Sequence, residues 1–198
     1  MKKNSFFIIL FIYALSTSVA AQTEAKLNIV TTAALIPNFG FEIQLGNRSS
    51  FQLDVLASFW DSINGSPLHV TQIFPEYRRY FKPNMLGFFI GGHIGFGMFT
   101  LSKYGYPNNI HQSGRNTYYG FTIGYKKHLN ENWSLEFFIG GGSQQAHYRG
   151  YNNDIGQRVD EKENFTKRPF NLSGELIPYR GGIMIVYRIP PFVRKKKL

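Results

Sequence analysis

Apolar and polar residues alternate one by one along segment after segment of this chain. In one such segment Phe39, Phe41 and Ile43 share one side, and Glu42 and Gln44 share the other. A period of two is that of a β-strand, whereas an amphipathic helix repeats its apolar positions roughly every 3.6 residues. Aromatic residues make up 17% of the chain, which also favours strands over helices. The sequence therefore predicts an all-β fold.

Eight of these segments are about as long as a tilted strand that crosses a bilayer, which needs roughly 9–11 residues. The predicted strands are Lys26–Leu35, Asn38–Gly46, Phe51–Trp60, His69–Phe81, Leu86–Leu101, Arg115–Leu129, Trp133–Arg149 and Ile177–Ile189. Short turns alternate with longer connections at Asp61–Leu68, Ser102–Gly114 and Gly150–Leu176. This rhythm is typical of outer-membrane barrels with short periplasmic turns and long surface loops. We expect an eight-stranded antiparallel up-and-down transmembrane β-barrel.

The first residues have the pattern of a secretory signal peptide. Lys2 and Lys3 precede an apolar run from Phe6 to Leu15, and small residues follow at Ser18–Ala21. A retained anchor helix would need about 18 or more apolar residues, so the run is too short for one. We expect residues 1–21 to be a signal peptide and residues 22–198 to form the barrel, with a short basic C-terminal tail. The expected location is the cell outer membrane, with both termini of the mature chain in the periplasm.

Periodicity alone does not say which face of the barrel meets lipid, because a soluble barrel with an apolar interior has the same alternation. The face opposite the apolar one is sparse in charge and rich in glycine, as expected for a crowded lumen. On the predicted fifth strand this face carries Gly87, Phe89, Gly91, His93, Gly95 and Gly97. Aromatic residues near predicted strand ends would form an interfacial girdle: Tyr77, Phe81, Tyr125, Trp133 and Tyr187. These features favour the transmembrane barrel.

The charge of the chain limits the classes of partner that it is expected to bind. The formal net charge is +10, but Lys2, Lys3 and the run Arg194–Lys197 hold much of it, so the body of the chain is only mildly basic. An exported protein rarely meets nucleic acid, and we expect no nucleic-acid partner. The expected partners are outer-membrane lipid and lipopolysaccharide. With no cysteine in the chain, a lipoprotein anchor and disulfide staples are excluded.

Eight charged residues are predicted to face the lumen and to pair there. They are Glu42, Asp54, Glu76, Arg78, Lys126, Glu136, Arg180 and Arg188. The interior of an eight-stranded barrel is just wide enough for side chains, and unpaired buried charges are costly. We therefore expect a structural plug, with a catalytic carboxylate or a proton path as the alternative. Pro75 precedes Glu76 within a predicted strand, and we expect a β-bulge there.

No motif in the sequence predicts a catalytic site, a metal site or a cofactor. The five histidines lack the spacing of metal ligands, and Gly140–Gly142 lacks the Lys and Ser or Thr that complete a phosphate-binding loop. The strongest enzymatic alternative is a lipid A-modifying, deacylase-like barrel. Such deacylases carry a Ser two residues after a His, which is missing here, although His147 and Ser143 share one strand face.

The sequence resembles an uncharacterised family of small outer-membrane β-barrels common in Bacteroidetes, domains of unknown function with an OmpA-like eight-stranded barrel. The residues that carry the resemblance are Asn28, Pro37–Glu42, Trp60, Pro75–Phe81, Tyr179–Ile183 and Tyr187–Arg188. The resemblance implies a fold and a location, but no activity. The chain departs from that pattern at its end, where Pro190–Val193 and a basic run follow the last strand.

The segment Gly150–Leu176 is too polar for a core or for a membrane strand, so we expect it at the cell surface. The residues we single out in it are Asn152, Asn153, Asp154, Arg158, Lys167 and Arg168. Long loops on a rigid scaffold carry recognition more often than strands do, although a simply solvated loop is the alternative. We expect a barrel with a plugged lumen whose loops contact envelope or host components. A pore is disfavoured by the plug.

Overall fold

The computed structural model describes residues 22–63, 66–102, 109–152, 154–158 and 175–190. The predicted signal peptide and basic tail lie outside these residues. Within them the strands are β1 (Thr23–Asn28), β2 (Asn38–Gln44), β3 (Ser49–Ile63), β4 (Ser66–Lys82), β5 (Leu86–Leu101), β6 (Ile110–His128), β7 (Trp133–Asn152), β8 (Gln157–Arg158) and β9 (Glu175–Ile189).

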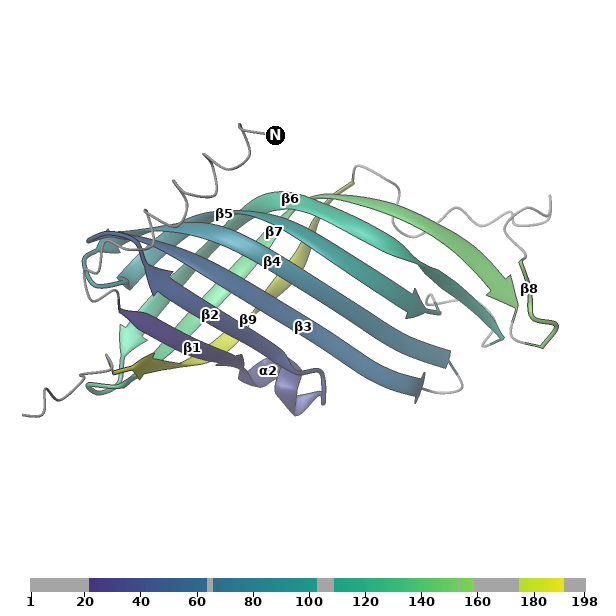
Figure 1. The fold of residues 1–198 in the computed structure, drawn as a ribbon, viewed down its shortest axis with the longest axis horizontal. Coiled ribbons are helices and arrows are strands. Elements are labelled where there is room, and N and C mark those ends of the chain that lie inside the picture. The colour runs from purple at the N-terminus through teal and green to yellow at the C-terminus, as the bar shows by residue number, and fades with distance from the viewer. Residues whose placement is uncertain (1–21, 64–65, 103–108, 153, 159–174, 191–198) are drawn as a thin grey trace, which may run out of the picture.

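Eight of these strands close into a barrel (Figure 1). Each strand from β1 to β7 pairs antiparallel with the next one in the chain, and β9 pairs with both β7 and β1. The two-residue strand β8 adds only to the end of β7. Thr23 lies opposite Ile189, so both described ends of the chain lie at the same end of the barrel as the three short turns. The predicted eight-stranded antiparallel up-and-down topology is confirmed.

The first strand is shorter than predicted. It ends at Asn28, and Ile29–Ala33 form a short helix, α2, instead of continuing the strand to Leu35. The side chain of Asn28 caps this helix by accepting a hydrogen bond from Val30 N at 3.2 Å, a role that asparagine favours. Among the described residues, no helix is long and apolar enough to cross a membrane.

Several other strands run farther than predicted toward the end opposite the short turns. The connection predicted at Asp61–Leu68 is mostly strand, because β3 reaches Ile63 and β4 begins at Ser66. Similarly, β6 begins at Ile110, where it pairs with Asn152 of β7. Polar residues belong to these strand ends because pairing with a neighbouring strand outweighs their weak β propensity. The fifth predicted strand agrees with β5 at both ends.

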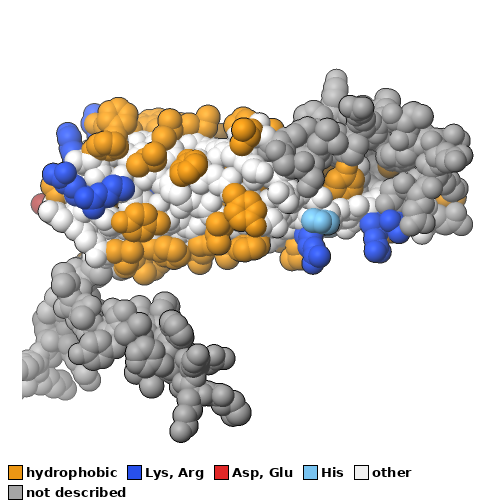
Figure 2. Space-filling model, turned by 90° about the horizontal axis from the view of Figure 1, so that it is seen from above, with side chains coloured by type: hydrophobic (Ala, Val, Ile, Leu, Met, Phe, Trp, Pro, Cys, Tyr) orange, Lys and Arg blue, Asp and Glu red, His pale blue; other side chains and the backbone are white. Residues whose placement is uncertain are grey.

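The barrel has its charged side chains inside and its large apolar side chains outside. Glu42, Arg78 and Glu136 are fully buried, whereas Phe59 and Phe121 are 72% and 70% exposed. Figure 2 shows hydrophobic side chains spread along the outer wall. The lumen also holds one cluster of apolar and aromatic residues: Tyr80, Met85, Phe89, Phe138, Met184 and Val186. This arrangement is the inverse of a soluble barrel, which buries its apolar face.

The prediction of a β-bulge at Pro75 is wrong. The register between β4 and β5 is the same on both sides of Pro75, where Ile73 pairs with Phe96 and Glu76 pairs with His93. The pairing of β9 with β7 instead shifts between Gly140 and Gly141 of β7. There Gly140 lies opposite Arg180 and Gly141 lies opposite Pro178, so that Tyr179 is the extra residue. A bulge lets two consecutive side chains face the same side, and both Tyr179 and Arg180 face the lumen.

Candidate functional site

A network of ion pairs occupies the lumen, and Lys26 lies within it. Its Nζ is 2.5 Å from Glu42 Oε2 and 2.5 Å from Glu136 Oε2. Arg78 from β4 contacts the same Glu136 at 2.8 Å through its Nη1. All four side chains are fully buried. Glu136 therefore has two cationic partners, Lys26 and Arg78, in the buried interior of the barrel.

The network extends toward the short-turn end through Lys126. Its Nζ is 2.5 Å from Glu24 Oε2 and 3.4 Å from Glu42 Oε2. Two neutral groups also satisfy Glu42. The Tyr80 hydroxyl donates a hydrogen bond to its Oε1 at 2.8 Å, and the Ser50 hydroxyl donates to the same oxygen.

The network extends in the other direction through Arg180. Arg78 Nε lies 3.0 Å from Glu76 Oε1, and Arg180 Nη1 lies 2.7 Å from Glu76 Oε2. The second terminal nitrogen of Arg180, Nη2, lies 2.6 Å from Asp54 Oδ2. Asn38 donates a hydrogen bond to the same carboxylate. Arg180 faces inward by simple alternation with Met184 and Val186 of β9, and the bulge turns Tyr179 inward beside it.

Seven of the eight residues predicted to face the lumen belong to this network: Glu42, Asp54, Glu76, Arg78, Lys126, Glu136 and Arg180. The exception is Arg188, whose Nη2 donates a hydrogen bond to His128 Nε2 at 3.1 Å. The sequence analysis missed Glu24 and Lys26. Their signal was present, since Glu24, Lys26 and Asn28 alternate with Ala25 and Leu27.

Seven of the eight barrel strands contribute a charged side chain to the network, so it spans the width of the lumen. The remaining strand, β5, has a glycine, Gly91, where it faces the network. A Cβ on Gly91 would lie 2.1 Å from Glu76 Oε1, so only glycine fits beside this carboxylate. Burying charges is expensive unless they are paired and hydrogen-bonded, and here the pairing meets that condition. The arrangement is a buried ion-pair network that links seven strands inside the barrel.

A cluster of polar and aromatic side chains lies next to the ion-pair network. His93 Nε2 is 2.7 Å from the Tyr179 hydroxyl, and its Nδ1 is 3.0 Å from Thr122 Oγ1. The ring of Phe74 packs edge-on against His93 at 5.7 Å between centroids. Both ring nitrogens of His93 are thus engaged. Among the described residues, no three His, Cys, Asp or Glu side chains cluster in a way that would hold a metal ion.

A cavity of about 280 Å³ lies between this group and the end with the longer connections. Its lining is uncharged and includes Tyr118, whose hydroxyl accepts hydrogen bonds from Gln72 Nε2 at 2.7 Å and Asn116 Nδ2 at 2.8 Å. The lumen is therefore charged toward the short turns and neutral toward the other end.

The structure describes only part of the predicted surface loop. Asn152 ends β7, and its side chain accepts a hydrogen bond from Asp154 N at 2.9 Å. Asn109 donates to the Asp154 carboxylate at 2.5 Å, which ties the β5–β6 connection to the one after β7. Arg158 lies in β8 and is exposed. Asn153, Lys167 and Arg168 lie outside the described residues.

The His147 and Ser143 pair considered for lipid chemistry lies on the outer face of β7. Both residues alternate with the inward Gln144, so they face away from the lumen network. In the described part of the chain, no hydrogen bond joins the two side chains. The geometry therefore lends no support to a nucleophile and base at these positions.

One comparison with known proteins finds a family. The sequence model of a family described as "Protein of unknown function (DUF3575)" matches residues 6–188. No curated protein and no solved structure matches the chain. The match covers every strand of the barrel up to Arg188, including all the residues of the lumen network.

Proposed function

The chain belongs to DUF3575, a family of proteins of unknown function, and from that premise we propose that it is an outer-membrane β-barrel with a plugged lumen. It displays the connections β3–β4, β5–β6 and β7–β9 at the cell surface, for contact with envelope or host components. Lipopolysaccharide and other outer-membrane lipids surround its wall, and both ends of the mature chain lie in the periplasm.

The observation that carries this proposal is the inverted barrel. Large apolar side chains on all sides face outward, as Phe39, Phe59, Phe96 and Phe121 do with exposed fractions of 51–72%. Burying one such side chain is worth about 1.5–3 kcal/mol, so a wall that left all of them in water would be costly. A bilayer removes that cost. Exposed apolar patches of this extent mark a surface that a membrane or a partner covers.

The lumen network supports a role that does not depend on conduction. Charged side chains from different strands meet inside the barrel: Arg180 of β9 lies 2.7 Å from Glu76 of β4 on the opposite wall, and Lys26 of β1 lies 2.5 Å from Glu136 of β7. Eight-stranded barrels have an interior that side chains can fill. Binding by the surface connections then remains as the main activity of the molecule, because recognition residues concentrate on loops that a rigid scaffold positions.

Fractionation of the producing cells tests this proposal. We expect the mature protein in the outer-membrane fraction, with an electrophoretic mobility in detergent that differs between unheated and boiled samples. A soluble periplasmic protein with one mobility would contradict the proposal. Mass spectra of lipid A from wild-type and deletion strains test the deacylase-like alternative, which requires an acyl-chain difference between the two.

A further inference from the structure

The outer wall changes from apolar to basic along single strands. On β7 the outward residues Phe137 and Ile139 are about half exposed and apolar, whereas His147 and Arg149 occupy the same face farther along. Figure 2 shows this change, with Arg or Lys and His side chains beyond the hydrophobic band at the right-hand end. That is the end of the barrel opposite the short turns.

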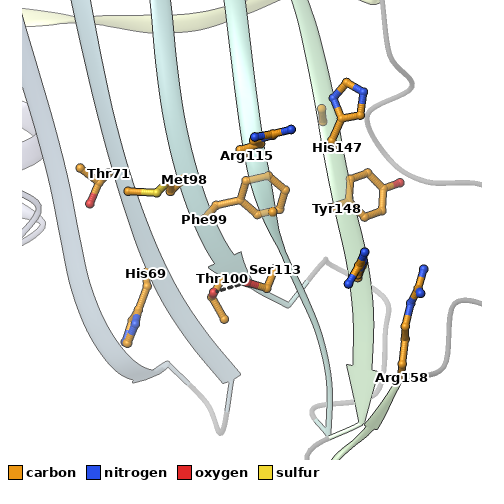
Figure 3. Close-up of a pocket in the computed structure, with 13 residues that line it drawn as sticks. His69, Thr71, Met98, Phe99, Thr100, Ser113, Arg115, His147, Tyr148 and Arg158 are labelled. Carbon is orange, nitrogen blue, oxygen red and sulfur yellow. Dashed lines mark hydrogen bonds between the residues drawn. The ribbon is translucent and has the colours of Figure 1, made fainter.

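Two adjacent rows of outward residues run across β4, β5, β6 and β7 at this place (Figure 3). The first row is Thr71, Met98, Arg115 and His147, and the second row is His69, Thr100, Ser113 and Arg149. Together with Arg158 of β8, these eight residues line a groove of about 970 Å³. We call this surface the basic groove.

Two arginines of the basic groove, Arg115 and Arg149, lie side by side on its outer face, whereas His69 at its edge is paired with Asp61 at 2.8 Å. Arg115 lies directly opposite His147 in the β6–β7 register, and Arg149 follows two residues later on the same face. In the ranges that the structure describes, neither Arg115 nor Arg149 has an acidic partner. Arg115 and Arg149 are diagonal neighbours in this register, and side chains of their length can reach one anion together, so this arrangement favours a bound anion.

The other groups in the basic groove specify the anion further. Thr100 and Ser113 present hydroxyls that lie 2.9 Å apart, and guanidinium groups bind phosphate oxygens in a bidentate manner. Met98 is 67% exposed and lies directly opposite Arg115 in the β5–β6 register. The groove therefore combines phosphate-binding groups with an apolar surface that continues into the hydrophobic band.

We propose that the basic groove binds the phosphate groups of a phosphorylated glycolipid in the outer leaflet. This inference rests on the proposed function, which places the short turns in the periplasm and the basic groove at the level of the outer headgroups. A lipid phosphate contacts Arg115 and Arg149 while its acyl chains lie along Met98 and the apolar band below it. The barrel thus has a defined lipid position on one side of its wall.

Native mass spectrometry of the mature protein in detergent micelles tests this site with diphosphorylated lipid A as the probe. The variant Arg115→Gln/Arg149→Gln removes two charges from the basic groove. Arg79→Gln/Lys127→Gln removes two exposed charges from the outer wall at the short-turn end and serves as the matched control. We expect at least about a tenfold loss of affinity in the first variant and little change in the control. Removing the phosphates from the lipid should weaken wild-type binding to the same degree.

Three outcomes would overturn the site. They are equal losses in both double variants, undiminished binding in the groove variant, and binding of inorganic phosphate as tight as that of the lipid. The electrophoretic shift on boiling separates the two proposals. A protein that shows the shift but binds lipid equally in all variants contradicts the basic groove alone. A protein that does not enter membranes contradicts the proposed function, and the basic groove falls with it.

Discussion

Glu76 Oε1 occupies the space that any side chain on Gly91 would need, because a Cβ at Gly91 would lie 2.1 Å from that oxygen. The carboxylate has little freedom to move away, since Arg78 and Arg180 hold it from two sides at 3.0 and 2.7 Å. A backbone position on β5 is thus coupled to the centre of the ion-pair network. The position of the Glu76 carboxylate therefore requires a glycine at position 91 as well as its two arginine partners.

Replacing Gly91 should therefore destabilise the barrel. We expect Gly91→Ala to lower the free energy of unfolding by about 1–3 kcal/mol, because overpacking forces the buried carboxylate away from its partners. Urea unfolding of the protein in lipid vesicles measures the change, with the folded fraction read from the electrophoretic mobility shift. Gly92→Ala is the control, since the neighbouring Gly92 faces outward and a Cβ there has no atom within 4 Å. Equal effects at the two positions would contradict the coupling.

Arg78 and Arg79 form a natural pair for testing the buried charges. Arg78 is fully buried between Glu76 and Glu136, whereas Arg79 is exposed and donates to Ser49 Oγ at 2.8 Å. Arg78→Met leaves two buried carboxylates short of a partner and should lower the free energy of unfolding by about 3–5 kcal/mol. Arg79→Met should change it by less than about 1 kcal/mol. The same unfolding assay compares them, and a difference within its error would mean that the ion pairs do not stabilise the barrel.

The proposed plug would prevent ion conduction through the barrel. Purified mature protein in planar bilayers should show no large steady conductance, because charged side chains from seven strands meet in the lumen. An open porin reconstituted in parallel provides the positive control. Stable channels in the nanosiemens range would refute the plug.

The long connection between β7 and β9 should be dispensable for folding but necessary for binding. We expect replacement of residues 152–171 by a short Gly-Ser linker to leave the boiling-dependent mobility shift unchanged, because loop-closure entropy varies only slowly with loop length. Capture of surface partners or adhesion should be lost. The same linker in place of residues 103–108 controls for the general effect of a shortened connection. If partner capture survives the first replacement, the recognition element lies elsewhere.

The sequence by itself determined which residues face the lumen over most of the barrel. Neighbouring side chains of one strand point to opposite faces of the sheet, whatever the partner strand is. A period of two therefore places Glu42 inside when Phe41 is outside, and Glu136 inside when Phe137 is outside. The same alternation would have added Lys26, the first residue of the predicted strand, and also Glu24 if the strand had been extended toward the N-terminus. The turn from strand to helix after Asn28 also has a local cause, the cap that Asn28 forms with Val30 N.

Only the tertiary structure decided how these residues meet. Lys26 and Glu136 are 110 positions apart and become partners because β1, β9 and β7 are neighbours in the closed barrel. The bulge that turns Tyr179 inward beside Arg180 is a mismatch between two strands, so neither strand reveals it alone. The rows of the basic groove likewise exist only through register across β4 to β7. The side of the barrel to which a residue points is set within its own strand, whereas pairing and register are set by the whole sheet.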